Sequence, residues 1–377
     1  MPALYIHIPF CTGKCPYCDF FSRSPRTNEI TAYIEALCLD IDYHLAGFLN
    51  GAALKSVFFG GGTPSLLSAA QIDTILSHIY RCAALADDIE ISLEGNPCSC
   101  NDSTRLRDYR RAGVNRLSLG VQSFNDADLL FLGRRHNAAT AMTATELALN
   151  NFDNVNIDLM FALPTQNNAS VEHSCQLLHQ LQPQHLSVYG LSIEANTPFA
   201  TMLQQKEIAA VDEELFHHQF LHYHKLLTAL GYEHYEISNY ARPGYRCHHN
   251  LTYWQRRPYL GIGAGAHSFI ADGWGQRLAA PDSIEQYIEA VTTGGTVRAL
   301  LETFDHAQAM AEFAYLGLRC CDGIDERQFQ HLFGCSFSAH FSHAISRCDH
   351  HLHRDNSRWH MDSASWLLYD HLISAFL

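Results

Sequence analysis

The sequence predicts an α/β protein: a partial (β/α)6-type barrel, similar in plan to a TIM barrel, followed by a mostly helical C-terminal accessory domain. Three observations lead to this prediction. Short apolar runs rich in β-forming residues recur along the first 240 residues, and between them lie segments with apolar residues three and four positions apart. After about Tyr240 the pattern changes to a stretch rich in Gly, Pro and aromatic residues and then to short helical segments. An open, doubly wound sheet is the structural alternative.

The expected strands are the six short apolar runs at residues 4–8, 56–59, 89–94, 115–121, 155–161 and 185–191. Their alternation with helical segments predicts a parallel sheet. The crossover helices are expected between them, among others at 31–49, 68–85 and 211–231, because apolar residues recur there at helical spacing. We place the domain boundary near residue 240, which predicts a barrel over 1–240 and an accessory domain over 241–377.

Charge and composition limit the classes of partner. The formal net charge is -14 with only 25 Lys and Arg, which disfavours a nucleic-acid partner because binding to phosphates needs clustered cations. The start "MPALYIHIPF" has no basic region or cleavage site, and no apolar run is long enough for an integral membrane segment, so we expect a cytoplasmic protein. Thirteen cysteines, an odd number, are expected to be mostly reduced thiols.

Candidate functional residues gather where the expected strands end. Cys11, Cys15 and Cys18 follow the first strand, Gly60 to Thr63 follow the second, Glu94 ends the third, Gln122 ends the fourth, and Asp158 lies in the fifth. In parallel β/α folds the carboxyl ends of the strands build the site. We therefore expect these residues to lie close together.

The loop "CTGKCPYC" places three thiols at spacings that let one loop bind a tetrahedral metal or a cubic iron-sulfur cluster. Two alternatives stay open. Cys15 and Cys18 alone read as a dithiol redox pair, which leaves Cys11 without a role. Structural zinc would need a fourth ligand, for which Cys247 to His249 are the dense candidates. A cluster with three protein ligands leaves one iron free to bind a cofactor.

The stretch "FFGGGTPS" favours a ligand close to the backbone, since three glycines follow a buried strand without the signature of a phosphate or dinucleotide loop. At this point the chain resembles the radical S-adenosylmethionine (SAM) superfamily. Within it, the chain resembles the oxygen-independent coproporphyrinogen III oxidase group and its heme-chaperone relatives of the HemW type. The resemblance rests on "YIHIPFCTGKCPYCDF", "FFGGGTPS", "EISLEGNP", "RLSLGVQSF", "LGRRH", "NIDLMFALP", "YEISNYARPGYRCHHNLTYW", "GIGAGAHSF" and "LGLRCCDGID".

The resemblance implies that Cys11, Cys15 and Cys18 hold a [4Fe-4S] cluster whose fourth iron is chelated by SAM. By matching motifs, it implies that Tyr5, Gly61 and Glu94 contact this SAM. The residues that match positions around a second SAM in the oxidase are Tyr17, Gly62, Thr63, Gln122, Arg134 and Asp158. Glu94 and Asp158 suit a ribose hydroxyl or an ammonium group, and Arg134 suits a carboxylate.

Two features distinguish the branches of this family. The oxidase branch continues its cysteine motif to CxxxCxxCxC and has a long N-terminal extension, whereas here Asp19 and Phe20 follow Cys18 and four residues precede Tyr5. Both features resemble the chaperone branch. So does "HNLTYW", a motif associated there with heme, which contains His249, Asn250, Tyr253 and Trp254. Cys247, His248 and His267 are secondary ligand candidates.

These features lead to three hypotheses. The first is a heme chaperone that binds heme and transfers it to an acceptor hemoprotein, and whether it is also an enzyme stays open. The second is the oxidase, which converts coproporphyrinogen III to protoporphyrinogen IX by 5′-deoxyadenosyl radical chemistry. The third is a zinc-stabilised barrel. Departures from the family pattern are Ala162 and Thr165, in place of glycines of a "GLPGQ" turn, and Gly95 and Cys98 after the third strand.

Overall fold

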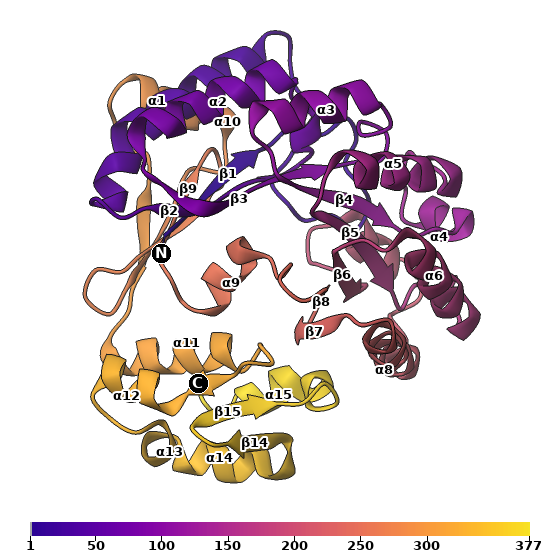
Figure 1. Ribbon diagram of the computed structural model, residues 1–377, viewed down its shortest axis with the longest axis vertical. Helices are drawn as coiled ribbons and strands as arrows, with labels where there is room; N and C mark the ends of the chain where they lie inside the picture. The colour runs from indigo at the N-terminus through magenta and orange to yellow at the C-terminus, as the bar shows by residue number, and fades with distance from the viewer. Residues whose placement is uncertain (1) are drawn as a thin grey trace.

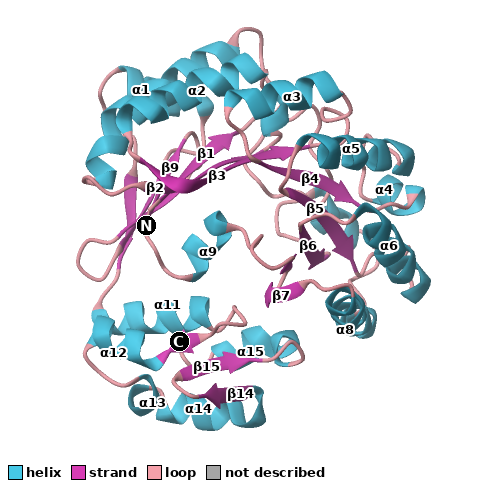
Figure 2. Ribbon diagram, viewed as in Figure 1, coloured by secondary structure: helices cyan, strands magenta, loops and turns pink. Residues whose placement is uncertain are grey.

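The computed structural model describes residues 2–377. Figure 1 shows a large curved sheet with helices along its outer side and a separate layer of small helices and strands below it. The large sheet has twelve strands in the order β12-β11-β10-β9-β1-β2-β3-β4-β5-β6-β8-β7. Figure 2 shows the same division between strands on the inside and helices on the outside.

Six strands of the first half of the chain pair in parallel and in sequence order. They are β1 (Ala3–Ile8), β2 (Leu54–Gly61), β3 (Leu85–Gly95), β4 (Arg116–Gln122), β5 (Val155–Phe161) and β6 (His185–Gly190). The helices between and after them are α1 (Glu29–Leu49), α2 (Ala69–Cys82), α3 (Ser103–Ala112), α4 (Asp126–Phe131), α5 (Ala138–Asn151), α6 (Asn168–Leu181), α7 (Pro198–Gln204) and α8 (Glu213–Ala229). The predicted partial barrel is confirmed, and all six expected runs form its strands.

Period-two alternation along these strands separates two buried environments. In β4, Leu117 and Leu119 belong to the apolar core shared with the helices, whereas Arg116, Ser118 and Gln122 alternate with them and are also buried. The same alternation places further polar side chains on the inner face of neighbouring strands: Ser56, Glu90, Ser92, Glu94, Asn156, Asp158, His185, Ser187 and Tyr189. The inner face of the barrel therefore carries many polar side chains, with apolar ones such as Phe58 and Met160 among them.

The sheet continues on both sides of the six parallel strands. On one side β8 (Asn239–Ala241) pairs antiparallel with β6, and β7 (Glu233–Glu236) pairs with β8. On the other side β9 (Tyr259–Ile262) pairs parallel with β1. Antiparallel strands β10 (His267–Ile270), β11 (Gln276–Ala279) and β12 (Ala299–Thr303) follow, and α10 (Ile284–Thr292) contacts α1.

The helix α9 (His248–Trp254) occupies a special position. Figure 1 shows it on the concave side of the large sheet, between the sheet and the lower layer. It contacts β2 above and α11 below. The segment that carries "HNLTYW" therefore lies against the inside of the barrel, where it meets the polar strand face.

The lower layer is mostly helical and has a small sheet of order β13-β15-β14. Its elements are α11 (His306–Gly317), β13 (Ile324–Asp325), α12 (Glu326–Phe333), α13 (Phe337–His340), α14 (Ser342–Cys348), β14 (Leu352–Asp355), β15 (Arg358–Met361) and α15 (Tyr369–Ile373). Short 3-10 turns lie at Pro64–Leu66, Asp349–His351 and Ser365–Leu368. The boundary expected near residue 240 stays a prediction; β9 to β12, which follow it, join the large sheet.

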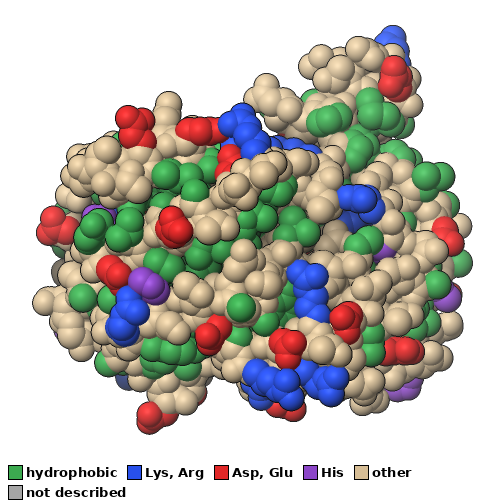
Figure 3. Space-filling view, turned by 90° about the horizontal axis from the view of Figure 1, so that it is seen from above, with side chains coloured by type: hydrophobic (Ala, Val, Ile, Leu, Met, Phe, Trp, Pro, Cys, Tyr) green, Lys and Arg blue, Asp and Glu red, His purple; other side chains and the backbone are tan. Residues whose placement is uncertain are grey.

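Figure 3 shows the molecule from the side of α1, α2 and α3, with acidic and basic side chains interspersed among apolar and neutral ones. Among residues 2–377, no helix combines the length and the apolar character that a bilayer crossing requires. The cysteines of the chain form no disulfide in this described part.

Candidate functional site

The cysteine loop leaves β1 at the carboxyl edge of the sheet and is tied down by its own backbone. The amide of Cys11 donates to the carbonyl of Arg23 (3.0 Å), and the amide of Cys18 donates to the carbonyl of Cys15 (3.1 Å). The three thiols are partly exposed and free. The loop thus presents its sulfur atoms outside the apolar core, where a bound group can reach them.

Two donors from other elements point at these sulfurs. The Thr63 hydroxyl donates to Cys11 Sγ (3.4 Å), and Arg134 Nη1 donates to Cys15 Sγ (3.5 Å). Both groups are hydrogen-bond donors, and donors to the ligating sulfurs are one means by which a protein tunes an iron-sulfur cluster. Among residues 2–377, no three His, Cys, Asp or Glu side chains converge on one point as ligands of a single ion. Three thiols on one loop are a donor set of the kind that binds an iron-sulfur cluster.

The glycines after β2 allow the close approach that the sequence suggested. Gly61 has φ +112°, and a Cβ there would lie 2.5 Å from the His7 ring. A Cβ on Gly62 would lie 2.6 Å from the carbonyl oxygen of Phe10. The Thr63 amide donates to that same carbonyl (2.8 Å). Only glycines let the end of β2 pass this close to the cysteine loop.

Two half-buried carboxyl groups, Glu94 and Asp158, lie on the inner face of the barrel, and Glu94 contacts one of these glycines. Glu94 accepts from the amide of Gly61 (3.1 Å), and burial together with the Asp158 charge raises the pKa of Glu94 to about 8. Asp158 accepts from Asn156 Nδ2 (2.6 Å), and burial raises the pKa of Asp158 as well. The charge of Arg116 opposes this rise at both carboxyl groups but does not cancel it, so a cationic or hydroxyl-bearing ligand would stabilise the charged forms. This pair fits the ammonium and ribose groups of SAM.

Gln122, Arg134 and Tyr17 complete the same edge. Gln122 has φ +69°, a strained conformation for this residue, and its Oε1 accepts from the Tyr189 hydroxyl (2.6 Å). Arg134 donates to the carbonyl of Gly120 (2.6 Å) and to the Tyr17 hydroxyl (3.4 Å), while its buried Nε has no hydrogen-bond partner. An unpartnered buried donor fits a carboxylate ligand.

Tyr5 lies inside the barrel between the cofactor edge and α9. Its hydroxyl bonds His7 Nδ1 (2.9 Å), and burial raises its pKa. Its ring lies 6.2 Å from the ring of His249. The structure therefore brings the three cysteines and the SAM candidates to one edge of the barrel. Tyr5 also contacts the α9 side of the barrel, through the ring of His249.

The "HNLTYW" residues form a second group around α9. His249 is 1% exposed, its Nδ1 bonds the Ser56 hydroxyl (3.0 Å), and its Nε2 bonds the Tyr253 hydroxyl (2.8 Å). Its ring stacks on Phe58 with a centroid distance of 4.9 Å. Burial and the nearby Arg116 charge lower the pKa of His249 to about 3. The imidazole is therefore neutral at physiological pH.

The other motif residues differ in their surroundings. The Arg319 guanidinium lies 4.4 Å above the Trp254 ring, whose buried Nε1 has no partner. Asn250 is half-buried on the helix. His267 is exposed at the start of β10 and is not among the aromatic neighbours of His249, which are Tyr5, Phe58 and Tyr253. Of the secondary candidates, Cys247 and His248 lie beside His249 at the start of α9.

Glu90 on β3 was not expected from the sequence. Its carboxylate accepts from the amides of His248 (3.0 Å) and His249 (3.1 Å) and from Cys247 Sγ (3.4 Å). It thereby supplies the acceptor that α9 lacks at its own N-cap, where no side chain makes a capping bond. The signal was present in "IEISLE", where acidic residues alternate with apolar ones, but that alternation was interpreted only as a strand.

Arg116 and a network of hydrogen bonds were also missed. Arg116 is 2% exposed and its Nε has no partner. Nearby, His185 bonds the side-chain oxygen of Asn156 (2.6 Å) and the Tyr235 hydroxyl (2.8 Å). Polar residues at alternate positions of "RLSLGVQ", "VNIDLMF" and "HLSVYG" could have revealed this lining before the fold was known.

The four positions that depart from the family pattern have different surroundings in the structure. Ala162 adopts φ +58°, the left-handed conformation in which glycine is favoured. Thr165 donates to Asp128 (2.5 Å), a bond that glycine cannot form. Gly95 leaves room for a buried neighbour, because a Cβ there would lie 2.5 Å from Cys100 Sγ. Cys98 is exposed.

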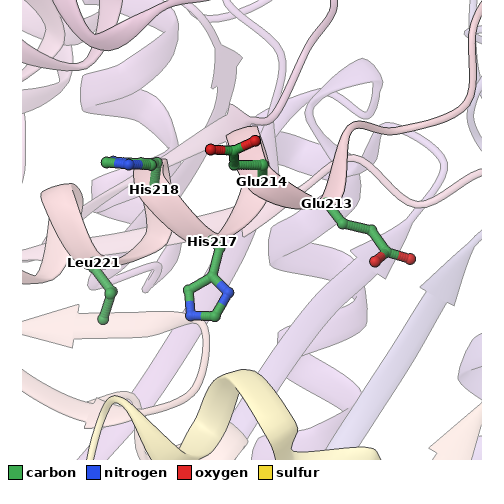
Figure 4. A pocket seen from close by; sticks show the side chains of 5 residues that line it. All are labelled: Glu213, Glu214, His217, His218 and Leu221. Atoms are coloured by element: carbon green, nitrogen blue, oxygen red, sulfur yellow. The ribbon is translucent and has the colours of Figure 1, made fainter.

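A hollow of about 370 Å³ lies elsewhere, along α8. Figure 4 shows its lining residues on that helix: Glu213, Glu214, His217, His218 and Leu221. None of them belongs to the cofactor edge or to α9, so this hollow is separate from the candidate site.

Residues 5–178 match the model of the Radical SAM superfamily, and residues 304–368 match the HemN C-terminal domain. The chain is 43% identical over 271 residues to the heme chaperone HemW of Escherichia coli (strain K12), which is 71% of this chain and 70% of that protein. It is 32% identical over 381 residues to HemW of Bacillus subtilis (strain 168), covering 100% of this chain and 99% of that one. A mitochondrial radical S-adenosyl methionine domain-containing protein 1 of Bos taurus is 37% identical over 87% of this chain and 75% of its own.

Among solved structures, the coproporphyrinogen III oxidase HemN from Escherichia coli has a TM-score of 0.83 and 23% identity, covering 100% of this chain and 90% of that one. This likeness shows that the two proteins share a fold. The barrel, its cysteine loop and the matched superfamily model define the chain as a radical SAM protein. Within that class it belongs to the HemW family, which it matches along nearly its whole length.

Proposed function

We propose that this protein is a heme chaperone, which binds heme and transfers it to an acceptor hemoprotein. The observation that carries the proposal is α9, where "HNLTYW" folds into one short helix that groups His249 with Tyr253 and Phe58. A neutral imidazole ligates iron, and flat aromatic side chains cover a macrocycle. The relatives named heme chaperone HemW support this reading, as does the continuation of the cysteine loop by Asp19 and Phe20.

The proposed cofactors are a [4Fe-4S] cluster, SAM and heme. Cys11, Cys15 and Cys18 would hold the cluster, with Thr63 and Arg134 as donors toward its sulfur ligands. The SAM side would be formed by Tyr5, Gly61 and Glu94. The region that matches the surroundings of a second SAM in the oxidase would be formed by Tyr17, Gly62, Thr63, Gln122, Arg134 and Asp158. A reduced cluster supplies an electron to SAM when both are bound.

The chain's own residues would orient and screen these groups. Glu94 and Asp158 would bind a ligand ammonium or hydroxyl group, which would stabilise the charged forms that burial makes costly. Arg134 would bind a carboxylate through its free Nε. A cytoplasmic location and a hemoprotein acceptor, both expected from the sequence, form part of the same proposal, and the identity of the acceptor stays open.

The oxidase is the alternative function. One observation favours it. Gln122 and Arg134 both lie beside Gly120, and the Arg134 charge acts on Asp158, at positions that match those around a second SAM in the oxidase. The fold shared with HemN is compatible with both functions and does not separate them. An assay is therefore needed to decide whether the protein acts as a coproporphyrinogen III oxidase.

The assay uses anaerobic, cluster-reconstituted protein with reductant, SAM and coproporphyrinogen III. Protoporphyrinogen IX and 5′-deoxyadenosine are measured together, with an authentic oxidase as positive control. We expect no tetrapyrrole product from protein with an intact cluster. Formation of protoporphyrinogen IX with turnover would establish the oxidase and contradict the chaperone proposal.

Heme binding is then measured by optical titration of wild type and His249→Ala. The exposed His267 provides a comparison variant, His267→Ala. We expect His249→Ala to weaken heme binding by at least about tenfold, the loss expected for one coordinate bond of modest strength. Equal binding by His249→Ala and wild type would remove the proposed role of the motif.

A further inference from the structure

The conformation of His249 does not suit its proposed role. Both ring nitrogens are engaged, with Ser56 and Tyr253, and the side chain is 1% exposed. Phe58 covers one face of the ring at 4.9 Å. An iron ion needs a free nitrogen lone pair and space for a macrocycle beside it. In the structure, therefore, the imidazole is masked by the barrel.

Apart from the Tyr253 hydroxyl, which belongs to α9 itself, the contacts that mask His249 come from the barrel strands. Glu90 on β3 accepts three donors from the first residues of α9, Cys247, His248 and His249. Ser56 on β2 holds the ring. A helix of seven residues has little stability of its own, so these contacts decide whether it stays docked.

Arg116 is a charged neighbour of Glu90. It is a buried cation on the same inner face as Glu90, and its Nε has no partner while α9 is docked. Once α9 leaves, the Glu90 carboxylate loses its three donors, and the guanidinium of Arg116 is available as a substitute. Arg116 is therefore an alternative partner for Glu90, the residue that holds α9. A helix that has both a docked and a released position needs such a partner for the group it leaves behind.

We propose that α9 is a latch: in its docked position it masks His249, and heme binds after α9 is released from Ser56 and Glu90. This proposal rests on the proposed function, because it assumes that His249 ligates heme. The proposal also predicts the direction in which heme affinity changes when the docked state is weakened. Since only the released state binds heme, the apparent affinity is reduced by the small fraction of released molecules, and weakening the docked state raises that affinity.

Ser56→Ala is the direct test, because it removes one hydrogen bond from the docked imidazole with little change in shape. Heme titration should show binding about two- to tenfold tighter than in wild type, the range that corresponds to one such bond. The matched control is Ser92→Ala on β3, since Ser92 is equally buried on the same inner face but its hydroxyl has no partner. Its heme affinity should equal that of wild type.

Cys247 gives an independent measurement on the unmodified chain. Its thiol is fully buried and bonded to Glu90 while α9 is docked. Alkylation by N-ethylmaleimide, followed by peptide mass spectrometry, should become faster at Cys247 when heme is added, and faster without heme in Ser56→Ala. Cys100, which is fully buried in the loop between β3 and α3, serves as the internal control and should not respond.

Unchanged or weaker heme binding by Ser56→Ala would overturn the latch, as would a Cys247 alkylation rate that heme does not raise. These outcomes are distinct from failure of the proposed function. If His249→Ala binds heme like wild type, the motif's role is lost, whereas a His249-dependent affinity without any Ser56 or Cys247 response would refute the latch alone.

Discussion

At the residue scale, the cofactor edge depends on side chains whose ionisation is set by burial. Glu94 has a pKa raised to about 8 by burial and by Asp158, so near neutral pH it is largely protonated. A raised carboxyl pKa contributes stability that is present below about pH 4.5 and is lost as the pH rises through about 8. A cationic ligand reverses this preference because it stabilises the carboxylate.

We therefore predict that SAM binding releases protons near neutral pH and becomes tighter as the pH rises from 6.5 toward 8.5, within the titration range of Glu94. Calorimetry in buffers of different ionisation enthalpy measures the release. Glu94→Gln should bind SAM more weakly and with little pH dependence. A pH dependence that persists in Glu94→Gln would assign the proton to another group.

Two glycines of the C-terminal region allow a second test at this scale. Gly323 and Gly334 both have positive φ, at 58° and 74°. A Cβ on Gly323 would overlap the carbonyl oxygen of Trp359, whereas nothing lies near a Cβ on Gly334. Both Gly→Ala substitutions therefore carry the penalty of placing alanine in a left-handed conformation. Only the substitution at Gly323 adds a steric clash.

Gly334→Ala should lower the free energy of unfolding by about 1 kcal/mol, the usual penalty of a left-handed alanine. Gly323→Ala should lower it by about 3 kcal/mol or more, because β13 and β15 must also separate. Urea denaturation of both variants measures the difference. Equal losses would mean that the backbone near Trp359 moves freely enough to accept the methyl group.

At the scale of the element, α9 carries a buried imidazole and is held against the barrel by contacts that the latch proposal requires it to break. In the docked position, burial and the Arg116 charge lower the pKa of His249 to about 3. Its other polar neighbours are Ser56, Tyr5, Tyr253 and Glu90. A lowered histidine pKa means that the unfolded or released form binds more protons. The contribution to stability is thus complete above about pH 6.5 and is lost as the pH falls toward 3.

Acidification from pH 7 to pH 5 should therefore favour release of α9. We expect faster alkylation of Cys247 per thiolate, or faster exchange of the α9 amides after correction for intrinsic rates, by about tenfold per pH unit below 6.5 at most. His249→Gln should remove most of this dependence. The same pH response in His249→Gln would show that another histidine, such as His185 with its own lowered pKa, controls the region.

At the scale of the whole molecule, the barrel separates its cofactor edge from its apolar core. The thiols of Cys11, Cys15 and Cys18 are partly exposed on a loop, while the core is formed by the outer strand faces and the helices. Loss of a cluster ligand should therefore change cofactor content far more than folding.

Cys11→Ser should abolish incorporation of iron and sulfide but leave the far-ultraviolet circular dichroism and the Tm of the cluster-free protein within about 2 °C of wild type, as small surface changes do. Iron and sulfide analysis after reconstitution is the measurement. Cys98→Ser, at an exposed cysteine outside the loop, is the matched control and should retain the cluster. Loss of the cluster in Cys98→Ser would extend the ligand set beyond the loop.

Much of this molecule follows from local sequence. The six parallel strands were predicted from short apolar runs between helical segments, because a strand buried under helices must be apolar on that face whatever its neighbours are. The cysteine loop and the glycines after β2 were predicted for a similar reason, since metal ligation and close backbone approach require particular residue types at particular spacings. Whether the assigned residues bind cluster, SAM and heme stays a prediction.

Only the tertiary structure decided where "HNLTYW" lies. Its capping acceptor Glu90 and its ring partner Ser56 come from strands more than 150 positions earlier in the chain. No local pattern encodes such pairings, because they arise when the chain closes and a buried amide or imidazole must find whichever partner the opposite wall presents. The sequence by itself determined the barrel and the chemistry of its loop; the closing of the barrel around α9 decided that His249 is masked.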